Sequence, residues 1–243
     1  MSVSMLKKIG LGVGGVVALV SGVVVGSAIE NRKRQPQVKP ERFNVIASKY
    51  DKEVGGTEHS IGLEDIRQRF LKKAQGRVLE TCAGTGRNNS YYDGSKVKEL
   101  TLVDNSKEML AEAVKKPFSP GIEHVRILQA KDLSAFANDE FDTVVDTFGI
   151  CSVEKPEDYL QEVRRVLKPG GLALFLEHGR VESSGPIAWL MNLWLDFRAP
   201  SHVNSFGCLW NREVGGLIEK AGFNIINKQT HHVGTCTEIE ARK

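Results

Sequence analysis

Two stretches of the chain combine residue types that could bind a nucleoside. Residues 78–88 (VLETCAGTGRN) run from an apolar segment into a turn of small residues. Glycine has no Cβ, so the backbone at Gly84 and Gly86 can approach a ligand closely. Asp104 closes the next apolar run, and a carboxylate there can accept hydrogen bonds from ribose hydroxyls. A dinucleotide fingerprint would need a third glycine at position 89, where the chain has Asn89. The pattern therefore predicts a nucleoside site and leaves the nucleoside open.

The elements that must position these residues are short β-rich runs separated by helical stretches. This alternation predicts βαβ units and a doubly wound, mostly parallel sheet, preceded by a polar helical segment at residues 43–73. In such sheets ligands bind at the carboxyl ends of the strands, where the residues above lie. The expected strands are Arg77–Thr81, Leu100–Asp104, Ile122–Leu128, Phe141–Thr147, Leu172–His178, Phe223–Lys228 and Gly234–Ile239, and the expected helices are Ser106–Lys115, Pro156–Leu167 and Asn211–Ala221.

A third motif, at residues 164–171, indicates the protein family. Residues 164–171 (RRVLKPGG) end a helix with cations, break it with proline and glycine, and lead into an apolar strand. Together with the turn from Glu80 to Gly86, with Asp104 and with residues 141–145 (FDTVV), this order of motifs resembles the class I S-adenosylmethionine-dependent methyltransferases. The resemblance covers about residues 43–240. It implies an α/β fold with a seven-stranded Rossmann-like sheet and S-adenosylmethionine as cofactor.

The resemblance also implies a set of cofactor contacts. In the family's pattern Cys82 occupies the first glycine position, and Gln129 stands where an acid often meets the adenine amino group. An amide can still bond the adenine edge. From the residues alone, Asp104 could instead cap a helix at Ser106, and Met109 could be plain core. The implied contacts are Glu80, Cys82, Gly84 and Gly86 around the methionine moiety and ribose, Asp104 at the ribose hydroxyls, Met109 near the adenine, Gln129 and Ala130 at its edge, and Thr147 near the sulfonium.

The acceptor side is less defined. Methyl transfer mainly requires alignment and exclusion of water, with a general base only for a protonated acceptor. Residues 146–151 (DTFGIC) lack the Asn/Asp-Pro-Pro-Tyr/Phe signature that resembles amino-group methylation of nucleobases or glutamine. His178, which closes the fifth expected strand, is the candidate base because neutral imidazole accepts a proton near pH 7. A purely structural histidine is the alternative. Cys151 is expected to be a buried thiol, since no cation adjoins it in sequence to activate it.

An apolar insertion follows the fifth expected strand. Residues 186–197 (PIAWLMNLWLDF) are apolar nearly all round and too short to span a bilayer. They predict an interfacial helix or the lid of an apolar acceptor pocket, and a helix packed on the sheet is the alternative. This insertion favours a small lipophilic acceptor, such as a thiol, a quinone or a lipid.

The N-terminal segment is apolar and glycine-rich. Residues 9–29 contain no charge and, as a helix, would cover about 30 Å of hydrocarbon. They predict a transmembrane helix, and a cleaved signal with the site GSA at 26–28 is the alternative. Glycines four apart, at 10 and 14 and at 22 and 26, would allow a second helix to approach and an oligomer to form. The expected organisation is a tail at 1–8, the transmembrane helix at 9–29, a basic linker at 30–42 and the methyltransferase domain at 43–243.

Charge is unevenly distributed. The chain carries 33 basic and 30 acidic residues, but residues 1–40 hold a net +5 and the rest a net −2. A slightly acidic body argues against a nucleic-acid partner.

The chain combines the apolar N-terminal segment with residues 50–51 (YD), 84–88 (GTGRN) and 177–178 (EH). This arrangement is similar to membrane-anchored methyltransferase-like proteins of the fungal mitochondrial inner membrane and to animal thiol methyltransferases of the endoplasmic reticulum.

We therefore expect a membrane-anchored S-adenosylmethionine-dependent methyltransferase. The mitochondrial inner membrane is favoured because no acid precedes Glu30, and the endoplasmic reticulum is the alternative. A non-catalytic mitochondrial assembly or RNA-stabilising factor that retains the fold is the alternative function.

Overall fold

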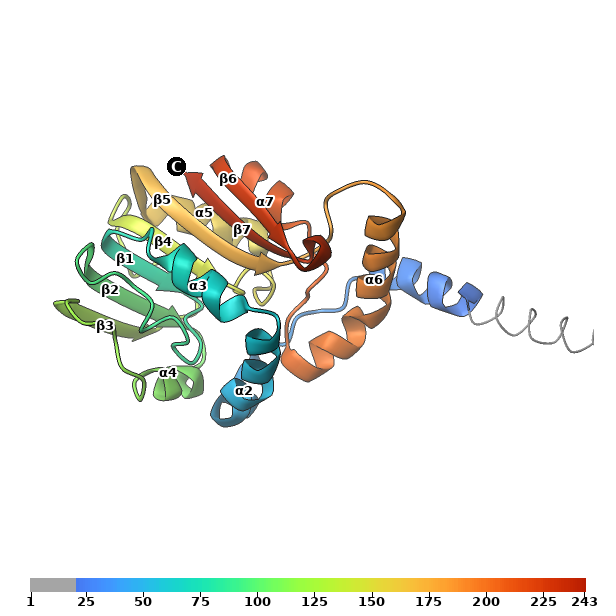
Figure 1. Ribbon diagram of the computed structural model, residues 1–243, viewed down its shortest axis with the longest axis horizontal. Helices are drawn as coiled ribbons and strands as arrows, with labels where there is room; N and C mark the ends of the chain where they lie inside the picture. Colours follow the sequence, from blue (N-terminus) through green and yellow to red (C-terminus); the bar gives the residue numbers. More distant parts are fainter. Residues whose placement is uncertain (1–20) are drawn as a thin grey trace, which may run out of the picture.

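A single seven-stranded sheet forms the centre of the molecule (Figure 1). The structure is a computed structural model that describes residues 21–243. The strand order is β3-β2-β1-β4-β5-β7-β6, and β7 is antiparallel to both of its neighbours. The doubly wound, mostly parallel sheet expected from the sequence is thus confirmed. The strands are β1 Gly76–Thr81, β2 Val97–Asp104, β3 His124–Gln129, β4 Phe141–Thr147, β5 Leu167–His178, β6 Asn224–His231 and β7 Cys236–Arg242.

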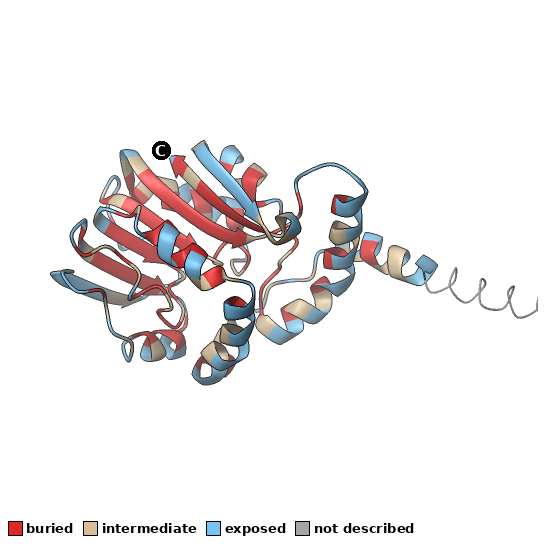
Figure 2. Cartoon of the chain, viewed as in Figure 1, coloured by how far each residue is buried: buried red, intermediate tan, exposed pale blue. Residues whose placement is uncertain are grey.

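Helices cover both faces of the sheet, which is why its central strands are apolar on both sides. Side chains alternate across a strand. Accordingly, Val78 joins the core cluster that includes Phe70, whereas Leu79 joins the cluster that includes Leu160 on the other face. The central strands are therefore mostly buried, as Figure 2 shows. The helices are α2 Glu41–Ser60, α3 Leu63–Leu71, α4 Lys107–Ala113, α5 Pro156–Val166, α6 Pro186–Phe206 and α7 Val214–Lys220.

Several predicted boundaries were wrong. The helical segment at 43–73 is two helices, because Gly62 with φ +69° separates α2 from α3. The last two strands begin and end later than predicted, because the chain turns at His232 and Val233, whose φ values are +52° and +60°. The apolar insertion continues to Phe206 and ends at Gly207 with φ +87°. Composition alone did not reveal the left-handed turn at His232 and Val233, because neither residue is glycine.

The N-terminal part of the described chain lies beside α6 (Figure 1). Residues 21–33 are helical, and Ala28 is buried. The side-chain amide of Asn31 donates to the carbonyl of Asp196, in α6, at 3.0 Å. Most of the predicted transmembrane segment, including the first glycine pair, lies outside the described residues. Among residues 21–243 no helix combines the length and apolar character needed to cross a membrane.

Candidate functional site

A cavity of about 820 Å³ opens at the carboxyl ends of β1, β2 and β4. This volume lies in the range of small-molecule and cofactor sites. Seven predicted site residues line the cavity, and three do not. The lining residues are Cys82, Gly84, Asp104, Met109, Gln129, Ala130 and Thr147, whereas Glu80, Gly86 and His178 lie outside it.

The glycine turn and Asp104 converge on this cavity. The backbone N–H of Gly84 donates to Asp104 Oδ2 at 2.8 Å, and the N–H of Ser106 donates to Oδ1 at 2.8 Å. Loss of solvent raises the pKa of Asp104, although both N–H groups act to lower it. Ser106, whose hydroxyl accepts from the N–H of Met109, caps helix α4. Asp104 is therefore not the cap residue, and its remaining lone pairs are available to a ligand.

Cys82 holds a backbone conformation that usually requires glycine. Its φ is +51°, in the left-handed region where a Cβ costs roughly 1–2 kcal/mol. Space beside it comes from Gly149, since a Cβ on that residue would lie 2.8 Å from Cys82 Cβ. Burial raises the pKa of the Cys82 thiol well above its usual value, and Asp146 acts in the same direction. The side chain is therefore a neutral part of the cavity wall.

Glu80 acts on the turn from beneath. It is buried and accepts hydrogen bonds from Tyr92 Oη at 2.6 Å and from Asn88 Nδ2 at 2.8 Å. Asn88 Nδ2 also donates to Thr147 Oγ1 at 3.0 Å. Burial raises the pKa of Glu80 to about 7 against the pull of its donors. Glu80 thus positions the turn through Asn88.

Gly86 has a packing role in the same turn. Its φ is +70°, and a Cβ there would lie 3.0 Å from the Cα of Ala113 in α4. The turn can therefore pack closely on α4 only with glycine at this position.

The predicted adenine end lies between β3 and α2. Met109 is buried against Ile46 and Ala47 of α2 and also lines the cavity, so it is both core and wall. Gln129 is exposed, and its Nε2 donates to the carbonyl of Asn105 at 3.2 Å. The N–H of Ala130 donates to the carbonyl of Asp104 at 3.0 Å.

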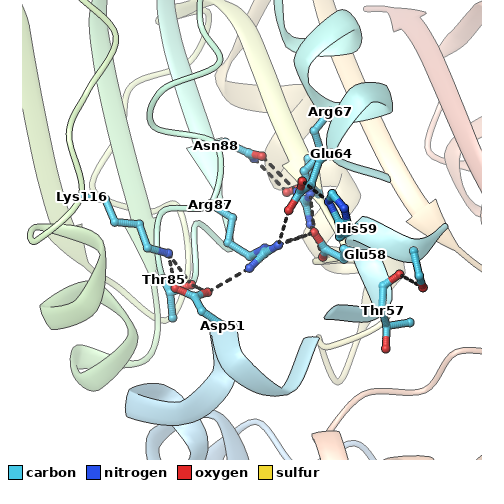
Figure 3. A network of polar contacts seen from close by, with 12 residues as sticks. Asp51, Thr57, Glu58, His59, Glu64, Arg67, Thr85, Arg87, Asn88 and Lys116 are labelled. Carbon is cyan, nitrogen blue, oxygen red and sulfur yellow. Dashed lines mark hydrogen bonds and ion pairs between the residues drawn. The ribbon is translucent and has the colours of Figure 1, made fainter. Parts of the chain in front are cut away.

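Helix α2 forms a wall of the cavity that sequence reasoning missed. Asp51 accepts from Thr85 Oγ1 at 2.7 Å and from Arg87 at 3.3 Å, and it pairs with Lys116 (Figure 3). Burial alone would raise the pKa of Asp51, but the hydrogen bonds from Lys116 and Thr85 lower it. A charged side chain of α2 is thus attached directly to the glycine turn.

A second attachment lies two helical turns further along α2. Glu58 accepts from Arg67 at 3.0 Å and from Arg87 at 2.7 Å (Figure 3). The two cations lower its pKa although burial raises it. Arg67 also donates to Asn88 Oδ1 at 3.0 Å. Asp51 and Glu58 stand seven positions apart and so share one helix face, a spacing that could have indicated this contact from the sequence.

Buried acids hold the loop after β4. Tyr159, which lines the cavity, donates to Asp146 Oδ2 at 2.8 Å, and burial raises the pKa of Asp146 to about 7. Glu177 Oε1 accepts from the N–H groups of Gly149 and Ile150 at 2.8 and 3.1 Å. Sequence reasoning did not single out these acids, because their roles depend on burial.

His178 lies behind the cavity wall. Its ring centroid is 5.3 Å from that of Phe148, and Phe148 lines the cavity. Its Nε2 faces Cys208 Sγ at 3.8 Å. Cys151 is buried as expected, and its Sγ donates to the carbonyl of Phe148 at 3.2 Å. The base role of His178 stays a prediction.

Known proteins share both sequence and fold with this chain. A family model described as a methyltransferase domain matches residues 79–175. The chain is 31% identical to "Methyltransferase OMS1, mitochondrial" of Saccharomyces cerevisiae over 88% of this chain, but it spans only 49% of that protein. It is 30% identical to human "Thiol S-methyltransferase TMT1A", over 77% of this chain and 75% of that protein. Demethylmenaquinone methyltransferase of Leptospira interrogans is 32% identical, over 63% of this chain and 65% of that protein.

A solved structure supports the fold independently. A methyltransferase from Thermotoga maritima superposes with a TM-score of 0.59 at 22% identity and covers 84% of this chain and 99% of its own. The site geometry fits S-adenosylmethionine, because the glycine turn and the carboxylate of Asp104 meet in the wall of one cavity. The chain thus belongs to the class I S-adenosylmethionine-dependent methyltransferases, with S-adenosylmethionine as its cofactor.

Proposed function

We propose that the chain is a membrane-associated methyltransferase that methylates a small lipophilic acceptor, such as a thiol, a quinone or a lipid. One observation carries this proposal. The wall of the cavity that contains Gly84 and Asp104 also includes the aromatic side chains of Phe43, Tyr50 and Phe148. A single space thus offers polar groups for a nucleoside and aromatic rings for an acceptor.

The polar end would hold the cofactor through residues already described. Asp104 would accept from the ribose hydroxyls, Gln129 and Ala130 would meet the adenine edge, and Thr147 would lie near the sulfonium. The cofactor supplies an electrophilic methyl group. The chain's own contribution is to align that methyl group with the acceptor and to exclude water, which the wall formed by α2 favours.

Among the three acceptor classes, a thiol makes the smallest demand on a base. A free thiol has a pKa near 8.5, so a fraction is already thiolate at neutral pH. The ring of Phe148 separates the imidazole of His178 from the cavity. Direct proton transfer to His178 would require Phe148 to move. This arrangement supports a thiol, and the human relative is named as a thiol S-methyltransferase.

Membrane association is supported by the apolar surface of α6. Ile187, Trp189 and Leu190 are each more than half exposed, at 65%, 58% and 56%. They lie on the helix that contacts residues 21–33, and the uncharged sequence of residues 9–20 precedes that segment. Large exposed apolar patches mark interaction sites. A mitochondrial membrane is the proposed location because the yeast relative is named mitochondrial, and the endoplasmic reticulum is the alternative.

The test is methyl transfer by the full chain in detergent with S-adenosylmethionine labelled on its methyl group. A panel of alkyl thiols, quinols and phospholipids is offered, and the product of each is measured. We expect label in the thiol. No label in any lipophilic acceptor, with cofactor binding verified by calorimetry, would overturn the proposal. Failure to bind the cofactor at millimolar concentration would favour the non-catalytic scaffold.

Two variants make the assay specific. Asp104→Ala removes an acceptor of two charge-assisted hydrogen bonds, together about 4 kcal/mol, so cofactor affinity should fall about 1,000-fold. Asp65→Asn changes an exposed acid on α3 and should leave affinity unchanged. Full affinity in the Asp104→Ala variant would show that the ribose is bound elsewhere.

A further inference from the structure

We propose that Cys151, His178, His202 and Cys208 form a closed, structural zinc site beside the cavity. Their ligand atoms come together from separate parts of the fold. Cys151 follows β4, His178 ends β5, His202 lies in α6, and Cys208 follows α6. The proposal is independent of the proposed methyl acceptor, because metal content can be measured without any substrate.

The ligand atoms of three of the four residues lie close enough together for one metal ion, and His202 adjoins one of the three. The ligand atoms of Cys151, His178 and Cys208 all lie within 4.8 Å of one another. Cys208 Sγ lies 3.8 Å from His178 Nε2 and 3.2 Å from His202 Nε2. With Zn–S near 2.3 Å and Zn–N near 2.0–2.1 Å, a tetrahedral site places sulfur and nitrogen about 3.5 Å apart. These two distances fall on either side of this value. His202 does not belong to the cluster of three and reaches it through Cys208 Sγ, so its ring must move toward the other ligands to complete the site.

The segments that carry the two cysteines are already held together. The N–H of Leu209, next to Cys208, donates to the carbonyl of Cys151 at 2.8 Å. Arg212 donates to the carbonyls of Ile150 and Val153, both at 2.7 Å. These bonds fix the loop on either side of Cys151 against the segment after α6. The cysteine pair is therefore preorganised by backbone contacts that need no metal.

The turn and the imidazole beside Cys208 are fixed as well. Gly207 directs the chain back toward the sheet with φ +87°, and a Cβ there would lie 2.6 Å from the carbonyl oxygen of Lys39. Trp210 stacks on the ring of His202 at 4.0 Å between centroids and 15° between planes. Packing thus holds the ring orientation that points His202 Nε2 at Cys208 Sγ. Metal ligands are usually oriented by such contacts with neighbouring residues.

The donor set suits zinc in its charge and its hardness. Two thiolates and two neutral imidazoles balance the charge of Zn²⁺, so the loaded site adds no net charge to the interior. Both cysteines are buried, at 1% and 5% exposure. Two cysteines and two histidines are a usual structural zinc set, and four protein ligands leave no position open for a substrate. The inferred role is therefore structural.

The site would connect the acceptor end of the cavity to the apolar helix. His178 contacts Phe148, which lines the cavity, and His202 belongs to α6. A metal bound by both would hold α6 at a fixed position relative to the cavity wall. It would also occupy the imidazole nitrogen that a general base needs, so the zinc site and the base role of His178 exclude each other.

The first experiment is metal analysis of the full chain purified in detergent without chelators. We expect about one zinc ion per chain by plasma mass spectrometry. After replacement of zinc by Co²⁺, we expect a thiolate-to-cobalt charge-transfer band and the intense d–d bands of tetrahedral coordination. A wild-type chain whose cobalt spectrum lacks the thiolate band would overturn the proposal, whatever the variants do. A Cys151–Cys208 disulfide in the freshly purified chain under non-reducing conditions would overturn it as well.

Variants then assign the ligands. The double variant Cys151→Ser/Cys208→Ser should lose the bound zinc and the charge-transfer band, and His202→Gln should weaken metal retention at least tenfold in a chelator competition. The control is Cys236→Ser, which changes another buried cysteine and should retain the metal. Equal metal content in the wild type and the double variant would contradict the assignment. Calorimetry with S-adenosylmethionine on the same samples separates loss of the zinc site from loss of the methyltransferase site.

Discussion

The two ends of the cavity are held together by different kinds of interaction. At the cofactor end, α2 is attached to the glycine turn by a network of charges that includes Asp51, Glu58 and Arg87. At the acceptor end, Phe148 contacts an imidazole and a thiol, and the guanidinium of Arg67 reaches its ring from the charge network, at 5.0 Å from the centroid. α6, next to that end, exposes tryptophan and aliphatic side chains to its surroundings.

This difference matches what each end would bind. A charged, ribose-containing cofactor suits a polar wall with fixed hydrogen-bond partners, whereas a lipophilic acceptor suits an apolar wall that adjoins a membrane. The two ends also differ in how far apart in sequence their residues lie. The cofactor end uses short motifs at 78–88, 104–109 and 129–130, whereas the region behind Phe148 combines residues that follow β4, end β5 and follow α6. Three sets of variants test this difference between the two ends.

The largest expected effect concerns the charges that hold α2. Glu58→Ala leaves the guanidinium of Arg67 without its carboxylate, and the side chain of Arg67 is only 5% exposed. Removing one partner of a buried ion pair costs about 3 kcal/mol or more. We expect the free energy of unfolding, measured with urea, to fall by that amount. Cofactor affinity should fall too, because Arg67 donates to Asn88 beneath the turn.

A matched control lies on the same helix. Glu53 forms an exposed pair with Lys49, four residues away, and the two side chains are 38% and 55% exposed. Exposed pairs contribute little, so Glu53→Ala should change stability by less than about 0.5 kcal/mol. Equal effects of the two substitutions would mean that the ion pairs do not hold α2 in place.

The next effect is a pH dependence of the free energy of unfolding, which we expect from Glu80 next to the glycine turn. The pKa of Glu80 is raised from 4.5 to about 7 by burial. The native state therefore retains a proton that the unfolded state loses. The stabilisation is complete below about pH 4.5 and is lost as pH rises through 7, by at most about 3 kcal/mol. Glu80→Gln should flatten this fall in unfolding free energy between pH 4 and pH 7.5.

In the Glu80→Gln variant, the slope of unfolding free energy against pH should decrease but not vanish, because Asp146 has a similarly raised pKa of about 7. Glu108→Gln, which changes an exposed acid on α4, serves as the control and should keep the full slope. A Glu80→Gln variant with an unchanged slope would show that Glu80 is ionised in the native state throughout this range.

The smallest effect tests the apolar helix. The three tryptophans of the chain are Trp189, Trp194 and Trp210, so fluorescence reports on this region alone. Trp189 and Trp194 are 58% and 48% exposed, whereas Trp210 is half-buried against His202. In vesicles with brominated phospholipids, the Trp210→Phe variant should be quenched at least twofold more than the Trp189→Phe/Trp194→Phe variant. Equal quenching would place α6 away from the lipid.

Sequence motifs predicted that the glycine turn and Asp104 would meet, because that contact depends on local spacing at the strand ends. Gly84 and Asp104 meet as their strand-end positions require, and neighbouring parallel strands bring them together. Glu80 was assigned to the ligand but faces Tyr92 and Asn88, because its position on β1 directs its side chain beneath the turn. A motif gives the position of a residue along the strand. The neighbour that its side chain contacts depends on the direction of that side chain in the folded chain.

The acceptor end could not be predicted in the same way. Cys151, His202 and Cys208 are far apart in sequence, and nothing in their spacing indicates that they converge. Their proximity depends on the turn at Gly207 and on the length of α6, and the predicted helix ended nine residues too early. The attachment of α2 was missed for a related reason, since its partners Arg67 and Arg87 belong to different elements.

The charge network of α2 also has a consequence for turnover. S-adenosylhomocysteine, the spent form of the donor, must leave a cavity whose wall includes Phe43 and Tyr50 of this helix. If α2 moves aside for that exit, Asp51 must separate from Arg87 and Lys116. Dissolved ions screen such partly exposed pairs. Ionic strength would then set how quickly the enzyme exchanges spent donor for fresh donor.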